Sequence, residues 1–97
     1  MHHYDIIVVG LGCVGLSTAY HWAKKGMKVL GIEMAPKPGF IGSSSFGDTR
    51  IWRVTHGNEY KNRMMEDALV IWNEIEKELG DQLIFKKPLL TIGSDRK

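Results

Sequence analysis

A glycine-rich segment is the first part of the chain whose residue types and spacing could do chemistry. Its sequence is Gly10-Leu11-Gly12-Cys13-Val14-Gly15. Gly10 allows a tight turn, Gly12 lets a phosphate approach the backbone because it has no Cβ, and Gly15 lets a helix pack close to a strand. The first amides of such a helix face the phosphates, and the helix dipole favours their charge. The spacing therefore predicts a turn that binds a diphosphate.

An acidic residue after the next apolar run, Glu33, supports this prediction. It follows the turn at the spacing of roughly 20 residues expected of a carboxylate that binds the ribose hydroxyls of an adenine dinucleotide. The same carboxylate disfavours a 2′-phosphate and hence NADP. The pattern alone leaves both FAD and NAD open, and a glycine turn with a purely structural role is the alternative. The residues predicted to bind the dinucleotide are Gly10, Gly12, Cys13, Val14, Gly15 and Glu33.

A second candidate is the stretch from Ser43 to Arg53, which reads Ser-Ser-Ser-Phe-Gly-Asp-Thr-Arg-Ile-Trp-Arg. Its hydroxyls and glycine are suited to a loop that binds a phosphate, a ribose or the edge of a flavin. Arg50 and Arg53 are three residues apart, so a helical turn would place them on one side. Two guanidinium groups suit a carboxylate or developing negative charge, because they stay charged and bind bidentately. Surface arginines in ion pairs are the alternative.

The elements that must position these residues follow from the hydrophobic pattern. Residues 4–9 form a β-branched run that predicts a buried parallel strand. Residues 13–25 predict a helix that Gly26 ends, and residues 28–33 predict a second strand. Together they predict an α/β fold that opens with one βαβ unit over residues 4–34.

The rest of the chain predicts a loop, a long helix and short strands. Pro, Gly and Ser residues mark the loop, whose candidate binding part covers residues 42–57. The helix is predicted over residues 58–79, with Asn58 as a plausible N-cap and Gly80 beyond its end. Its apolar stripe is interpreted as a packing surface. Short strands are expected at 83–85 and 89–92, within a final segment of residues 83–93.

The composition excludes several classes of protein. The chain has 97 residues, of which 43% are hydrophobic and 25% charged, values typical of one soluble globular unit. No stretch approaches the roughly 20 apolar residues of a membrane span, and the N-terminus lacks the features of a secretory signal. The net charge of +2 is too small and too scattered to suggest nucleic acid. We therefore expect no membrane, nucleic-acid or metal partner.

Cys13 is the only cysteine, which excludes an internal disulfide framework and a cysteine-rich zinc module. A thiol in the first turn of a helix can be reactive, but a small residue packed beside the turn is the simpler interpretation. A parallel sheet is buried on both faces and needs several strands. Because 97 residues supply only a small core, we expect the chain to be a piece of a larger protein.

Three features of the sequence resemble the monomeric sarcosine oxidase and pipecolate oxidase group of the D-amino-acid-oxidase-like flavoproteins. The first is the segment 5–15 together with Glu33, which many flavoproteins share. The second, Gly47-Asp48-Thr49-Arg50-Ile51-Trp52-Arg53, is much more specific. The third runs from Tyr60 through Arg63-Met64-Met65 and Ile71-Trp72 to Leu79, and is followed by Leu89-Leu90-Thr91-Ile92-Gly93. Their order and spacing cover nearly the whole chain.

The resemblance implies FAD rather than NAD, and a Rossmann-like FAD-binding domain of which this chain is the N-terminal portion. In the family, the residue matching Arg50 lies close to the flavin ring and the one matching Arg53 helps hold the substrate carboxylate. Both are therefore expected to be catalytic, and Arg50 also to contact the cofactor. Residues matching Ser44 and Ser45 lie in the flavin-binding loop. Phe46 departs from the pattern, because relatives often carry a histidine there.

The implied activity is that of an FAD-dependent oxidase of N-methylated or secondary amino acids such as sarcosine or pipecolate, with O2 as acceptor and H2O2 as product. The full-length protein is expected to be a monomer with an intracellular location, cytoplasmic or peroxisomal. Because family members are several times longer, the chain alone is expected to be inactive. A fragment of an NAD-dependent dehydrogenase and a non-catalytic dinucleotide-binding module are the alternatives.

Overall fold

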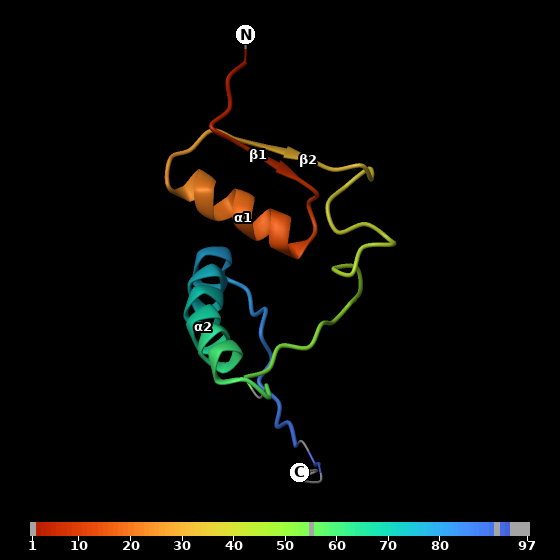
Figure 1. Cartoon of the computed structure of the whole chain (residues 1–97), viewed down its shortest axis with the longest axis vertical. Coiled ribbons are helices and arrows are strands. Elements are labelled where there is room, and N and C mark those ends of the chain that lie inside the picture. The colour runs from red at the N-terminus through yellow and green to blue at the C-terminus, as the bar shows by residue number, and fades with distance from the viewer. Residues whose placement is uncertain (1, 55, 91, 94–97) are drawn as a thin grey trace. The chain divides into compact units, whose positions relative to one another are not determined.

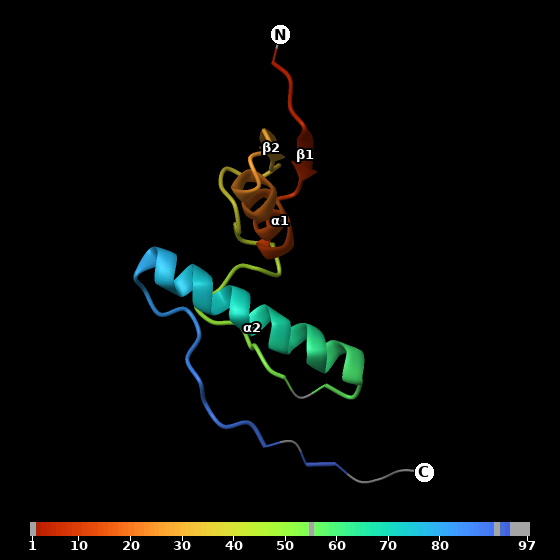
Figure 2. The same ribbon diagram turned by 90° about the vertical axis from the view of Figure 1, so that its left-hand side faces the viewer.

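The computed structural model describes residues 2–54, 56–90 and 92–93. It divides into two compact units, Met1–Arg50 and Ile51–Lys97. The first holds β1 (Ile6–Val9), α1 (Cys13–Lys24) and β2 (Val29–Ile32), and the second holds α2 (Glu59–Leu79) (Figures 1 and 2). Among the described residues, no helix is long and apolar enough to span a membrane.

In the first unit, β1 and β2 pair in parallel, with Ile6 opposite Val29 and Val9 opposite Ile32. The pair is extended at one end by the Asp5 amide, which donates to the Lys28 carbonyl oxygen at 2.8 Å. These contacts confirm the predicted βαβ unit, whose strands and helix are each shorter than predicted by one or two residues. The differences lie at the ends of elements, where local hydrogen bonds rather than the apolar pattern decide the boundary.

Helix α1 covers one face of the two-stranded sheet (Figure 1). Val8 lies on the covered face, since a Cβ placed on Gly15 would come within 3.4 Å of its Cγ1 atom. Side chains alternate across a strand, and Ile7 and Val9 on the opposite face are 57% and 80% exposed. Within the described residues of the first unit no element covers the second face, so burial of this strand on both faces stays a prediction for the larger protein.

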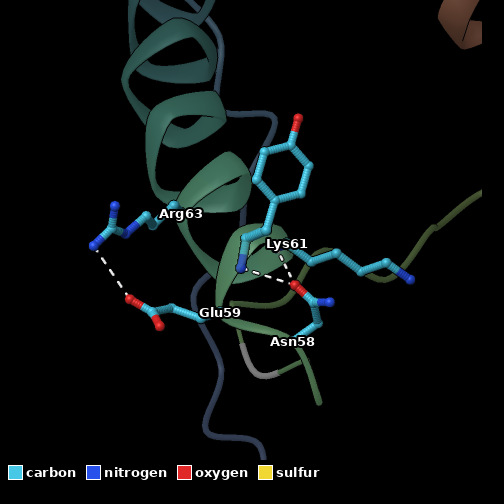
Figure 3. Close-up of polar contacts among 5 residues, drawn as sticks. Asn58, Glu59, Lys61 and Arg63 are labelled. Carbon is cyan, nitrogen blue, oxygen red and sulfur yellow. Dashed lines mark hydrogen bonds and ion pairs between the residues drawn. The ribbon is translucent and has the colours of Figure 1, made fainter.

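Helix α2 begins where the sequence predicts. The Asn58 side-chain oxygen accepts hydrogen bonds from the amides of Tyr60 at 2.8 Å and Lys61 at 3.3 Å (Figure 3). Glu59 lies in the first turn, and its carboxylate pairs with Arg63 at 3.2 Å. The helix ends at Gly80, which has φ +67° and donates its amide to the Glu76 carbonyl oxygen. Asn58 is therefore the N-cap, and the predicted cap is confirmed.

Replacing Asn58 with alanine is expected to destabilise α2 by about 1 kcal/mol, because two amides lose their acceptor. Far-ultraviolet circular dichroism during thermal unfolding measures this change. Asn58→Asp is the matched control, since aspartate also accepts at a helix start and should retain the wild-type melting temperature. Equal melting of the alanine and aspartate variants would contradict the capping role.

The apolar stripe of α2 is only partly covered in the second unit. Ala68 and Ile75 are half-buried, whereas Tyr60 and Met64 are exposed. The strands expected at 83–85 and 89–92 are not formed by residues 83–90 or 92, and Thr91 lies outside the described residues. A strand requires a neighbouring strand to satisfy its amides and carbonyls, and no described segment pairs with this one.

Two amides of this segment bond to a side chain of α2 instead. The carboxylate of Glu76 accepts from Leu83 and Ile84, each at 2.8 Å. Donation from Ile84 and then Leu83, with a smaller contribution from the charge of Lys86, holds the pKa of Glu76 below its ordinary value of 4.5. Hydrogen bonds to Glu76 thus hold the segment that follows Gly80 against α2.

The attachment through Glu76 should depend on pH. A carboxyl whose pKa is lowered by folding stabilises the folded form above its ordinary pKa, and this stabilisation is lost as the pH falls through the lowered value. Amide hydrogen exchange at Leu83 and Ile84, corrected for intrinsic rates, should therefore show protection that declines below about pH 4.5. Glu76→Gln is the control, because its amide does not titrate. The same pH dependence in that variant would contradict the assignment to Glu76.

Candidate functional site

The glycine turn between β1 and α1 requires glycine at two positions, for different reasons. Gly10 has φ +92°, a conformation that side chains disfavour. A Cβ on Gly15 would clash with the carbonyl oxygen of Gly10. The first turn of α1 therefore packs directly on the end of β1, as the spacing of these glycines predicts.

A serine from the following loop lies at the start of α1. The Ser45 hydroxyl accepts a hydrogen bond from the Cys13 amide at 2.8 Å, and the Ser45 amide donates to the Ser43 hydroxyl at 3.0 Å. A Cβ on Gly12 would lie 3.2 Å from the Ser45 Oγ atom. The structure thus brings Ser45 next to Gly12 and Cys13, although Cys13 and Ser45 are 32 residues apart in the sequence. The thiol of Cys13 is free and exposed.

The other amides in this turn remain available. Among the described residues, the amides of Val14 and Gly15 have no hydrogen-bond acceptor. They lie in the first turn of α1, where the helix leaves its amides unpaired and its dipole is positive. With the bare backbone of Gly12 and the hydroxyl of Ser45 beside them, they form a set of donors that fits a diphosphate.

Glu33 closes the turn from the end of β2. Its carboxylate accepts from the Leu11 amide at 2.8 Å and from the Ala35 amide at 3.2 Å. Donation from Leu11, followed by Ala35, lowers the pKa of Glu33 below its ordinary value of 4.5. The carboxylate is therefore charged at neutral pH and is half-buried next to the glycine turn. Carboxylate oxygens have further lone pairs for a ribose hydroxyl.

Arg50 folds back on its own loop. Its Nε donates to the carbonyl oxygen of Ser44 at 2.7 Å, and its Nη1 donates to that of Thr49 at 2.9 Å. Gly47 permits this arrangement, since its φ is +137° and a Cβ there would meet Arg50 Nη1 at 2.5 Å. The geometry links Arg50 to Ser44 through the serine's carbonyl group, and it leaves the Nη2 atom outside these contacts.

Arg53 belongs to the second unit, and its surroundings differ. Residues 50–53 form no helical turn, so no helix places Arg50 and Arg53 on one side. This segment makes no helical hydrogen bonds, and the Arg50 side chain donates instead to the carbonyl oxygens of Ser44 and Thr49. Arg53 lines an open cavity of about 460 Å³. The nearby indole Nε1 of Trp52 is buried and finds no acceptor within residues 2–54, 56–90 and 92–93.

Comparison with known proteins decides the family. The model of the FAD dependent oxidoreductase family matches residues 5–97. The chain belongs to this family. The match confirms the resemblance proposed from the sequence, and it confirms the Rossmann-like α/β fold of an N-terminal FAD-binding portion. It also decides between the two dinucleotides, because the family uses FAD rather than NAD.

Relatives of the chain are similar to it over nearly its whole length. It is 39% identical to the human peroxisomal sarcosine oxidase over 93% of the chain, and 37% identical to the monomeric sarcosine oxidase of Bacillus sp. (strain B-0618) over 94%. It is 32% identical to the N-methyl-L-tryptophan oxidase of Yersinia pestis (strain Pestoides F) over 95%. The chain spans about a quarter of the length of these relatives, between 23% and 25%. No solved structure matches it.

Two features of the site were not selected from the amino-acid sequence. Ser43 supports Ser45 through its hydroxyl, and the sequence offered only a run of three serines with no means to rank them. His56 lines the cavity beside Arg53. The sequence shows only a histidine three residues after an arginine. This spacing does not indicate that the two side chains line one cavity unless the backbone conformation is known.

Proposed function

We propose that this chain is the N-terminal, FAD-binding part of a longer oxidase of N-methylated or secondary amino acids. The observation that carries the proposal is the glycine turn, in which Glu33 and Ser45 converge on a helix start with free amides. The substrate class is supported by the names of the relatives, which oxidise sarcosine or N-methyl-L-tryptophan.

In this proposal the turn binds the adenosine diphosphate part of FAD at its phosphates and at its ribose. The amides of Val14 and Gly15 face the phosphates, and Gly12 lets them approach because it has no side chain. The Ser45 hydroxyl accepts from the Cys13 amide and completes the donors through its own O–H group. Glu33 binds the ribose hydroxyls through lone pairs that Leu11 and Ala35 do not use. The loop 42–57 carries the remaining contacts.

Arg50 and Arg53 take different roles. Arg50 is held by two carbonyls of its own loop and would stabilise negative charge on the flavin through the rest of its guanidinium. Arg53 would bind the substrate carboxylate, since it lines a cavity and pairs with no carboxylate among the described residues. When bound, FAD supplies the acceptor for the hydride equivalent that leaves the amine, and reoxidation by O2 yields H2O2.

The proposed activity requires the part of the protein that lies outside these residues. The chain spans about a quarter of its relatives and buries no described side chain. We therefore expect the 97 residues alone to be inactive, and the segment 83–93 to gain strand partners from a later part of the protein. The full-length protein is proposed to be a monomer, as the name of the Bacillus sarcosine oxidase states for that relative, and to be cytoplasmic or peroxisomal.

The visible absorption spectrum of the purified full-length protein tests the proposal. A flavin spectrum that bleaches without oxygen on addition of sarcosine, pipecolate or another N-methyl amino acid, and peroxide formation in air, are the expected results. A protein that binds flavin but bleaches with none of these amines would overturn the substrate class. A colourless protein that takes up no FAD would leave a module without catalysis and overturn the oxidase.

A further inference from the structure

The cavity in the second unit combines two kinds of wall. It is lined by Ile51, Arg53, His56 and Met65. Two of these side chains are apolar, one is a permanent cation, and one is an imidazole. Arg53 makes no ion pair within the described ranges. A small anion with an apolar part and a polar group next to its charge would match this lining.

His56 is held in place on both sides. Its backbone amide donates to the Asn62 side-chain oxygen at 2.8 Å, and Asn62 lies in the first turns of α2. Its ring Nε2 lies 3.1 Å from the carbonyl oxygen of Arg53. The imidazole therefore folds back toward the residue that precedes it by three positions, and the Asn62 side chain on α2 holds the backbone of His56.

This contact fixes the tautomer of the neutral ring. A carbonyl oxygen only accepts hydrogen bonds, so Nε2 must be the donor. In neutral imidazole the other nitrogen is then an acceptor. Nδ1 of His56 is thus an acceptor next to a cavity whose other polar side chain, Arg53, only donates.

We propose that Nδ1 of His56 accepts a hydrogen bond from the amine of the substrate whose carboxylate Arg53 binds. The inference rests on the proposed function and deepens it. A secondary amino acid carries a carboxylate and an N–H donor on the same carbon atom, so it presents the two complementary groups to the cavity. Ile51 and Met65 provide the apolar walls for its N-alkyl group and side chain. His56 is therefore a specificity residue that distinguishes amino acids from other small carboxylates.

Two substitutions of His56 separate this role from support of Arg53. The amide of glutamine is bonded to Cδ and can replace the Nε2 donor to the Arg53 carbonyl. The amide of asparagine is bonded directly to Cγ, as Nδ1 is, and can replace the acceptor. Both variants retain the backbone amide that bonds Asn62. His56→Gln is thus the test variant and His56→Asn the matched control.

The test uses the full-length enzyme with two ligands. Sarcosine is the substrate, and methoxyacetate has an ether oxygen in place of the N–H group, so it keeps the carboxylate and cannot donate. Methoxyacetate binding is measured by the change in the flavin spectrum, and sarcosine oxidation by kcat and KM. His56→Gln should raise KM for sarcosine about 10-fold, as expected for loss of one hydrogen bond to a charged group. It should leave the Kd of methoxyacetate unchanged, and His56→Asn should stay within about 3-fold of wild type for both ligands.

Each other outcome overturns the inference. Wild-type KM for sarcosine in His56→Gln, or a parallel loss of methoxyacetate binding, would show that His56 does not contact the amine. Rescue by glutamine but not asparagine would assign His56 to support of the Arg53 backbone. These results leave the oxidase itself standing, because the wild-type enzyme must first contain flavin and oxidise sarcosine. Failure at that earlier step overturns the proposed function and this inference with it.

Discussion

Replacing Glu33 with alanine is expected to strip FAD from the full-length protein during purification. The carboxylate accepts from both Leu11 and Ala35, so its removal loses the proposed ribose contact and also frees two amides around the glycine turn. Loss of several charge-assisted hydrogen bonds corresponds to at least about 100-fold weaker binding. The ratio of flavin to protein absorbance after gel filtration measures this effect.

Glu33→Gln is the matched control for this experiment. Its amide oxygen can keep one of the backbone bonds, but it lacks the charge and the second acceptor oxygen. We expect flavin retention between those of the wild type and the alanine variant. Full retention of FAD by the alanine variant would contradict the role of Glu33, whereas the affinity for the amine should change little in any molecule that remains loaded.

Replacing Arg50 with alanine is expected to lower turnover about 100-fold while FAD still binds. A positive group aimed at developing charge in a dry site typically has an effect of this size. Rapid-mixing measurements of flavin reduction and reoxidation show which step slows. The loop contacts to Ser44 and Thr49 are lost as well, so flavin content must be measured alongside turnover.

Arg50→Lys distinguishes charge from geometry. Lysine retains the positive charge but cannot donate to two carbonyls and to a ligand in the fixed planar arrangement of a guanidinium. Partial recovery of turnover would assign most of the effect to charge. Unchanged turnover in the alanine variant would exclude Arg50 from the reaction and return it to a purely structural function in its loop.

The sequence predicted the parts of this structure that depend on neighbours along the chain. Helix α2 begins at the Asn58 cap and ends at Gly80, as the capping preferences of asparagine and glycine predict. The spacing of Gly10 and Gly15 predicted their close approach. The acid at the end of β2 was found in the same way, although its bonds to Leu11 and Ala35 were not foreseen. These features are local because each depends on a turn, a cap or one strand–helix crossover.

Features that depend on distant residues could not be predicted. The contact between Ser45 and Cys13 joins positions 32 apart, and nothing in a run of three serines indicates which hydroxyl reaches the helix. The strands expected at 83–85 and 89–92 are not formed by the described residues, because an apolar pattern does not supply a hydrogen-bonding partner. The exposure of Ile7 and Val9 has the same origin, since periodicity cannot tell which faces of a strand are covered.

The bond between Ser45 and Cys13 has a consequence for how the cofactor is acquired. Because a hydroxyl from the protein satisfies the first amide of α1, the two segments are ordered relative to one another before any dinucleotide arrives. A preorganised pocket avoids much of the loss of conformational entropy that would otherwise oppose association. FAD should therefore dock into the wild-type turn with little rearrangement, and a chain that lacks the Ser45 hydroxyl should load more slowly.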